Sequence, residues 1–208
     1  MNLLQGMLLL GIVGHAVNCY CDRQLSIFPN GTLTFANLPR IKEDGYAAKL
    51  MAGVSPRVPM RAGVLGVFSC VLECFGYAAL AFYAYQRAPI YGGLLFVCTV
   101  FFAALAAAYH LKTALAEWAF LQYGMDARAK GLMLDLLQCG APLKACFAGA
   151  MGYYVTLIVA ILTGAIGFPL WAVIFTILPI FLVLAPLKIV GTIHIASIVS
   201  MAAWLFLL

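Results

Sequence analysis

The sequence predicts an all-α polytopic integral membrane protein: a six-helix transmembrane bundle with an amphipathic helix at its cytoplasmic interface. Of the 208 residues, 65% are hydrophobic and only 9% are charged, whereas about a quarter of the residues in a soluble domain are charged. The apolar runs are continuous rather than alternating, which favours spanning helices over a β-barrel. Because a helical span takes roughly 20 residues, a chain of this length accommodates about six. We therefore expect a single membrane domain over residues 1–208.

The apolar stretches and the basic residues between them define an expected topology. The predicted spans are 3–20, 62–84, 91–110, 147–166, 168–187 and 189–207. Eleven of the twelve lysines and arginines fall in the connections after spans one, three and five, which lie on the same side of the membrane. Only Arg87, between spans two and three, falls on the opposite side. Basic residues favour the cytoplasmic side of a membrane. We expect a multi-pass protein of the inner (plasma) membrane, with both termini outside and cytoplasmic connections at 21–61 and 111–146.

Two further segments have distinct patterns. Residues 126–139 place apolar and polar side chains on opposite faces of a helix, with Asp126 as its cap, and such a helix is expected to lie along the cytoplasmic interface. Pro179 lies in the middle of the predicted fifth span, where a proline removes a backbone donor and should kink the helix.

Polar residues recur at helical spacing in two spans. His15, Asn18 and Asp22 form one stripe at the inner end of span one. His110, Thr113 and Glu117 form a second stripe that leaves span three, beginning next to Tyr109. Each stripe offers an imidazole, a hydrogen-bonding group and a carboxylate on one helical face.

Glu73 is the polar residue that most needs an explanation. It lies near the middle of span two, one turn from Tyr77, and a carboxylate inside a membrane must be protonated or paired. His194 opens span six at a similar depth to His15. Glu73, His15, His110 and His194 are therefore our candidate catalytic residues. The candidate ligand-binding residues are Asn18, Asp22, Tyr109, Thr113, Glu117 and Tyr77. The alternative is that these groups only satisfy one another between packed helices.

Metal and cofactor signals are weak in the sequence. His15 and Cys19 are four residues apart, and His110 and His194 could complete a ligand set. The seven cysteines form no CxxC pair, and the histidines form no HExxH motif. We therefore assign no residue to a metal site, keep metal binding by the His/Glu cluster as a lesser alternative, and leave the cofactor open. Phosphate loops and dinucleotide fingerprints are absent, so the expected partners are membrane lipids and a small amphipathic ligand rather than nucleic acid, with oligomerisation left open.

Three functions remain from these observations. The first is a membrane-embedded enzyme or binding protein that acts on a lipid-like or small amphipathic ligand through a buried His/Glu cluster in the cytoplasmic half. The second is a small transporter or channel, proton- or ion-linked, and the third is a structural membrane subunit. A continuous polar path to the outer face would favour transport, whereas a site closed above Glu73 would favour an enzyme.

Four short runs carry a family resemblance. They are Ala107–His110, Pro56–Arg61, Phe168–Trp171 and the progression Pro186, Gly191 and Ser197 into the last helix. On these residues the chain resembles an uncharacterised family of small six-span bacterial integral membrane proteins, classed only as a domain of unknown function. That family commonly carries Gly-Asp late in span one, where this sequence has Gly14-His15. The resemblance implies a six-span bundle and brings no activity with it.

Overall fold

The computed structural model describes residues 1–34, 36–138 and 140–208. Phe35 and Cys139 lie outside the described residues, and Cys139 is the last residue of the predicted amphipathic helix. The α-helices are α1 (Leu3–Ser26), α2 (Tyr46–Met51), α3 (Arg57–Tyr85), α4 (Pro89–Gln122), α5 (Ala127–Gln138), α6 (Ala141–Leu162), α7 (Ile177–Leu184) and α8 (Thr192–Leu207). Three 3-10 helices, η1 (Leu38–Lys42), η2 (Leu170–Phe175) and η3 (Ala185–Leu187), and a two-stranded hairpin of β1 (Ile27–Phe28) and β2 (Gly31–Thr32), complete the chain.

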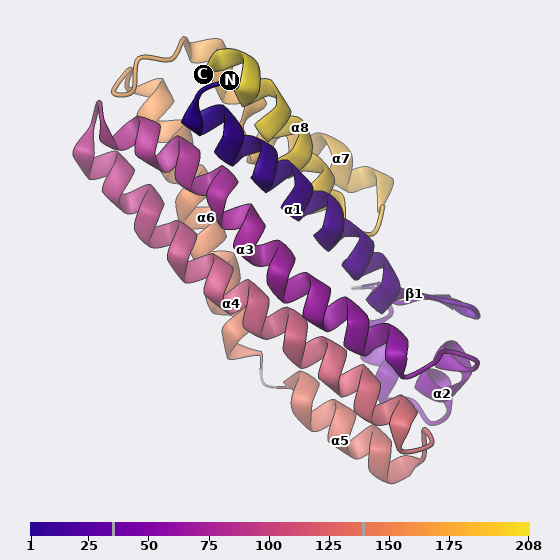
Figure 1. Cartoon of the computed structure of the whole chain (residues 1–208). Helices are drawn as coiled ribbons and strands as arrows, with labels where there is room; N and C mark the ends of the chain where they lie inside the picture. Colours follow the sequence, from indigo (N-terminus) through magenta and orange to yellow (C-terminus); the bar gives the residue numbers. More distant parts are fainter. Residues whose placement is uncertain (35, 139) are drawn as a thin grey trace.

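The long helices confirm the all-α class, and their length and composition are compatible with a membrane protein. Within the described residues, four helical segments are long and apolar enough to cross a membrane: α1, α3, α4 and the stretch Ala127–Leu162, which contains α5 and α6. They pack in the order α1, α3, α4, α6, and α8 lies against α1 (Figure 1). The two termini meet at one end of the bundle, where the Asn2 Nδ2 donates a hydrogen bond to the Leu208 carbonyl oxygen.

Close packing of α1 on α3 depends on glycine. A Cβ atom added to Gly14 would lie 2.6 Å from the backbone nitrogen of Glu73 and 2.8 Å from the carbonyl oxygen of Ser69. The two helices therefore approach backbone to backbone at this level, as small residues permit inside membranes. This contact places His15, the next residue of α1, beside Glu73.

The region predicted as the fifth span, 168–187, is not one helix. It consists of η2, α7 and η3, and Pro179 lies in the first turn of α7 rather than in the middle of a kinked span. A proline ring clashes with the carbonyl four residues earlier, but it is tolerated in a first turn. The helix therefore starts anew at Ile177. α7 and α8 form a hairpin, and α8 begins beside Cys19, well before the end of α1.

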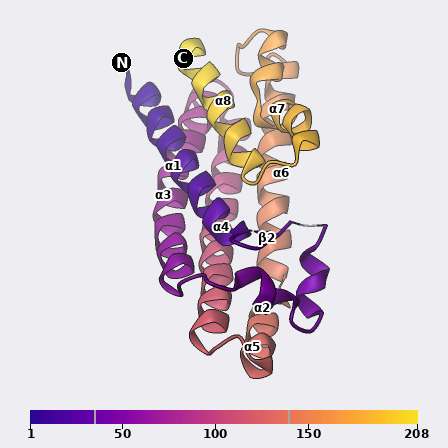
Figure 2. The same ribbon diagram turned by 90° about the vertical axis from the view of Figure 1, so that its right-hand side faces the viewer.

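A small helical cap covers the end of the bundle opposite the termini (Figure 2). There α2 and α5 bury apolar side chains against the last turns of α4, with Met133 of α5 and Phe120 of α4 almost fully buried. α5 begins as the sequence predicts, because the Asp126 side chain accepts a hydrogen bond from the Ala129 amide. The connection before α2 is tied to α5 by the Lys130 ammonium, 2.8 Å from the Asp44 carboxylate.

Candidate functional site

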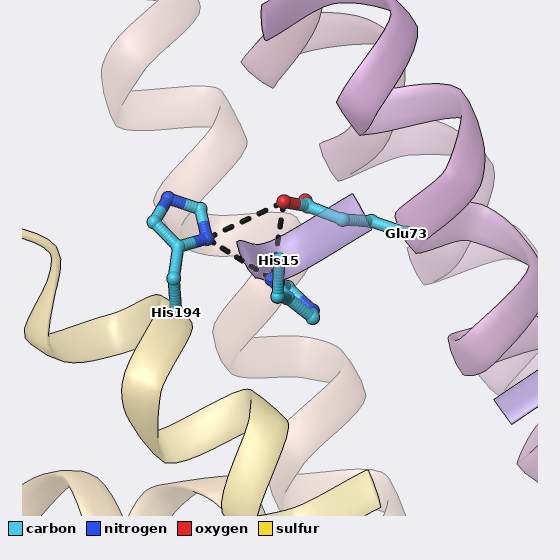
Figure 3. Close-up of side chains that lie close together, drawn as sticks. All are labelled: His15, Glu73 and His194. Carbon is cyan, nitrogen blue, oxygen red and sulfur yellow. Dashed lines mark hydrogen bonds and ion pairs between the residues drawn. The ribbon is translucent and has the colours of Figure 1, made fainter. Parts of the chain in front are cut away.

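Three side chains from three helices meet in the interior of the bundle (Figure 3). His15 comes from α1, Glu73 from the middle of α3, and His194 from the first turn of α8. Their exposed fractions are 2%, 5% and 9%. The Nδ1 atoms of the two histidines are 3.0 Å apart, and each faces Glu73 Oε1, at 3.1 Å from His15 and 3.3 Å from His194. The three atoms thus form a nearly equilateral triangle.

Hydrogen bonds alone do not satisfy this triangle while Glu73 is ionised. Each Nδ1 atom carries at most one proton, and a carboxylate oxygen only accepts. If both Nδ1 atoms are protonated, two hydrogens face each other between His15 and His194. If only one is protonated, the other nitrogen turns its lone pair toward Oε1. Every placement of protons on the two Nδ1 atoms therefore leaves one repulsive contact along an edge of the triangle. A proton on Glu73, or a cation within the triangle, would remove that repulsion.

Asn18 supports the carboxylate from the next turn of α1. Its Nδ2 donates to Glu73 Oε1 at 2.9 Å, while its Oδ1 is buried without a hydrogen-bond partner in the described residues. An unpaired buried acceptor costs free energy. Because the two ends of an amide are nearly isosteric, a flip would place Oδ1 where Nδ2 stands, 2.9 Å from Oε1.

Asp22 extends the cluster toward the cap. α1 runs to Ser26, past the predicted end of span one, so Asp22 lies in the helix and its carboxylate reaches two histidines. Oδ2 is 3.2 Å from His194 Nε2, and Oδ1 is 3.7 Å from His110 Nδ1. The Asp22 side chain is 33% exposed, whereas those of His110 and His194 are about 10% exposed. The cluster therefore reaches solvent or lipid headgroups through Asp22.

The charges of the cluster are not balanced by fixed cations. Within the part of the chain that the structure describes, no lysine or arginine forms an ion pair with Glu73 or Asp22, and their charged-group contacts are with histidines. A buried carboxylate is retained only when it is paired or coordinates a metal. The buried Glu73 therefore needs positive charge from a protonated histidine or from a bound cation, whereas Asp22 is partly solvated.

The end of the cluster nearer the termini is closed by aromatic rings. Tyr77 lies one turn along α3 from Glu73, with its ring edge-on to His15 and 5.5 Å away between centroids. Phe102 and Tyr153 pack against Tyr77 at 4.7 Å and 5.0 Å. The Tyr77 hydroxyl lies 3.3 Å from the Ser197 hydroxyl. This packed layer separates the histidines from the end that holds the termini.

The predicted site residues thus divide into two groups. His15, Glu73, His194, Asn18, Asp22, His110 and Tyr77 form one connected network. The other group continues along α4. Tyr109 lies against Lys112, while the Thr113 hydroxyl and one Glu117 oxygen are buried with no hydrogen-bond partner in the described residues.

Sequence reasoning missed which atoms would converge. It weighed Cys19 as a metal ligand, but the Cys19 sulfur lies 3.9 Å from the Gly191 carbonyl, outside the triangle. It also did not give Gly66 a role. That glycine leaves space for the His110 ring, which a Cβ atom there would overlap. Both features depend on helix-to-helix contacts that spacing within one helix does not encode.

Two cavities in the described residues have linings that include none of His15, Glu73, His194 and Asp22. One, about 230 Å³, lies in the cap and is lined in part by Ala47, Phe120 and Lys130. The other, about 30 Å³, lies between α1 and α3 beside Tyr20 and Arg61.

Comparisons with protein-family models, curated proteins and solved structures find no match to this chain. The resemblance drawn from the sequence stays a prediction, and the geometry of the network carries the functional argument.

Proposed function

We propose that this chain is a membrane-embedded metalloprotein that binds one divalent transition-metal ion between His15, Glu73 and His194. The observation that supports this most is the triangle of two imidazole nitrogens and one carboxylate oxygen, with sides of 3.0, 3.1 and 3.3 Å. A cation facing all three lone pairs removes the conflict that protons leave while Glu73 is ionised. Two imidazoles and one carboxylate are a ligand set for Zn²⁺ or Fe²⁺.

The dimensions of the triangle suit a metal. Corners about 3.1 Å apart lie about 1.8 Å from their common centre, and Zn–N and Zn–O bonds are about 2.0–2.2 Å. An ion would therefore sit slightly above the plane of the triangle with a fourth position free. Asn18 Oδ1 can fill that position after an amide flip, and so can a water molecule or a substrate. Three protein ligands with one open position are typical of catalytic metal sites.

The surroundings of the triangle also match those of metal ligands. A histidine ligand usually donates its second ring N–H to a carboxylate, which fixes the tautomer that points a lone pair at the metal. His194 Nε2 lies 3.2 Å from Asp22 Oδ2 in this way. In its unflipped orientation Asn18 is not a ligand, and its Nδ2 donates a hydrogen bond to Glu73 Oε1. His15 Nε2 has no such partner among the described residues, which makes His15 the least supported ligand.

The position of the site favours a metalloenzyme or metal-binding protein over a transporter. The aromatic layer around Tyr77 closes it toward the termini, and Asp22 opens it toward the cap. In our proposal the α7–α8 hairpin completes the expected six-span bundle among membrane lipids. The cap and α5 lie on the cytoplasmic side, where most of the basic residues fall, and both termini lie outside. A lipid-like or small amphipathic substrate would take the open metal position.

Equilibrium binding of Zn²⁺ and Co²⁺ to the detergent-solubilised full chain tests this proposal. We expect one tightly bound ion per chain and a Co²⁺ absorption spectrum of nitrogen and oxygen ligands. Mutating a residue that only hydrogen-bonds to a metal ligand lowers metal affinity by about 10–100-fold. Glu73→Gln changes a ligand itself, so it should reduce the affinity for the metal by about tenfold or more. The matched control is Glu117→Gln, which changes another buried glutamate, 4% exposed, that contacts none of the three ligands in the described residues.

Three results would contradict the proposal. The first is a wild-type chain that binds no ion at micromolar concentrations. The second is equal affinity in Glu73→Gln and Glu117→Gln. The third is a Co²⁺ spectrum dominated by sulfur-to-metal charge transfer, which would assign binding to the cysteines instead.

A further inference from the structure

The network contains a second group of carboxylate and imidazole side chains, nearer to solvent than the first. Asp22 lies seven residues after His15 on α1, about 10 Å along the helix at ~1.5 Å per residue. It faces His110 of α4 and the outer ring nitrogen of His194. We propose that Asp22, His110 Nδ1 and His194 Nε2 form an entry site, through which the metal reaches the core site. This inference rests on the proposed metal function.

The tautomer of His110 supports the entry site. His110 Nε2 lies 3.2 Å from the carbonyl oxygen of Ala62, which only accepts, so Nε2 carries the hydrogen. In the neutral ring Nδ1 then presents a lone pair, and the atom it faces is Asp22 Oδ1, at 3.7 Å. Two acceptors are thus directed at each other. Bonds of about 2.0–2.2 Å from each to one cation would span that distance.

The gradient of exposure gives the entry site its direction. The Asp22 side chain is 33% exposed, while the core ligands His15, Glu73 and His194 are between 2% and 9% exposed. The aromatic layer around Tyr77 blocks the opposite approach. An ion arriving from water therefore meets the Asp22 carboxylate first. Charged residues that line a narrow approach also raise association rates by about 10–1,000-fold.

His194 belongs to both sites and links them. Its Nδ1 faces the core triangle and its Nε2 faces Asp22. A neutral imidazole has one lone pair, so it can ligate a metal at only one of these sites at a time. With the ion in the core, Nε2–H donates to Asp22. With the ion in the entry site, Nδ1–H donates to Glu73. The exchange of tautomers passes the ion from one site to the other, and the chain holds one ion.

Stopped-flow loading of Co²⁺ into the detergent-solubilised full chain tests the entry site. His110 contacts no core ligand directly, so His110→Gln should slow both loading and release by about tenfold, within the range expected for a charged approach. Because an access site lowers the barrier to entry and to exit equally, its loss slows both rates by the same factor, and the dissociation constant and the final Co²⁺ spectrum should not change. The control is Glu43→Gln, an exposed acid paired with Arg40, which should load at the wild-type rate.

Two variants keep the test decisive if His110→Gln is poorly folded. Asp22→Asn removes a contact of the core ligand His194 and should therefore bind Co²⁺ less tightly than wild type. It should also load Co²⁺ more slowly than wild type, because the entry site loses its carboxylate. His15→Gln, which damages the core site, should leave a weaker Co²⁺ signal that disappears in the double variant with Asp22→Asn. A loading rate in His110→Gln and Asp22→Asn equal to that of wild type overturns the entry site, as does a change in release rate alone. If the wild-type chain binds no Co²⁺, the metal function itself fails; if it binds Co²⁺ and both variants load normally, only the entry site fails.

Discussion

Replacing Gly14 by alanine should separate α1 from α3 and misalign the site. The new Cβ would lie 2.6 Å from the Glu73 nitrogen and 2.8 Å from the Ser69 carbonyl oxygen, whereas ordinary contact begins at 3.4 Å. Since both are backbone atoms of a helix, the helices must move apart by about 0.8 Å. Overpacking of this kind costs about 1–3 kcal/mol, and for a chain of this size each kcal/mol lowers the melting temperature by about 2–4 °C.

We therefore expect Gly14→Ala to melt about 2–12 °C below wild type in a detergent thermal-shift assay. Its Zn²⁺ affinity should fall about tenfold or more, because ligands must be held to within roughly 0.5 Å. Gly93→Ala is the matched control, since a Cβ atom there meets nothing within 4 Å. It should be neutral or gain up to about 1 kcal/mol from helix propensity. Equal melting temperatures for the two variants would refute the close packing of α1 on α3.

Three further changes test other contacts. Gly66→Ala should expel the His110 ring, which its Cβ would overlap, and the histidine resonances in NMR should report a changed environment; an unchanged ring would contradict the packing of α3 on α4. Tyr77→Phe removes a buried hydroxyl contact with α8 and should cost about 0.5–1.5 kcal/mol, measured as a lower melting temperature than wild type, while equal stability would count against that contact. Lys130 holds the pKa of Asp44 below its ordinary value through a hydrogen bond and its charge. The pair therefore stabilises the fold above the ordinary range of an aspartate, and its contribution is lost as the pH falls through the lowered value. In Lys130→Met the pKa should rise toward about 3.9 in a carboxyl NMR titration, and the same pKa in both proteins would show that the pair is not formed.

The sequence predicts the helical class well because composition alone sets it. A chain with 9% charged residues cannot cover a soluble surface, and continuous apolar runs form helices inside membranes. The polar stripe of His15, Asn18 and Asp22 was also visible, because all three lie on one helix at helical spacing. Their joint position in the network follows from that spacing together with the contact of α1 on α3.

The fifth span and the triangle itself were not predictable in the same way. Apolar composition allows a span over 168–187, but Pro179 favours a new helix start, and the chain forms η2, α7 and η3 instead. His194 meets His15 only because α8 begins beside Cys19, inside the bundle. The sequence predicts a similar depth for His194 and His15, but the meeting of their Nδ1 atoms depends on how the hairpin of α7 and α8 packs on α1, which no local pattern encodes. Sequence reasoning weighed His15, Cys19, His110 and His194 as metal ligands, whereas the group that the fold brings together is His15, Glu73 and His194.

X-ray absorption at the zinc edge, on the Zn²⁺-loaded full chain, tests the central claim most directly. We expect one zinc per chain, with a first shell of nitrogen and oxygen at about 2.0–2.2 Å and the outer-shell scattering of two imidazoles. The same measurement on His194→Gln should show the loss of one imidazole or of the zinc. A first shell of sulfur at about 2.3 Å, or an unchanged two-imidazole spectrum in His194→Gln, would contradict metal binding by His15, Glu73 and His194.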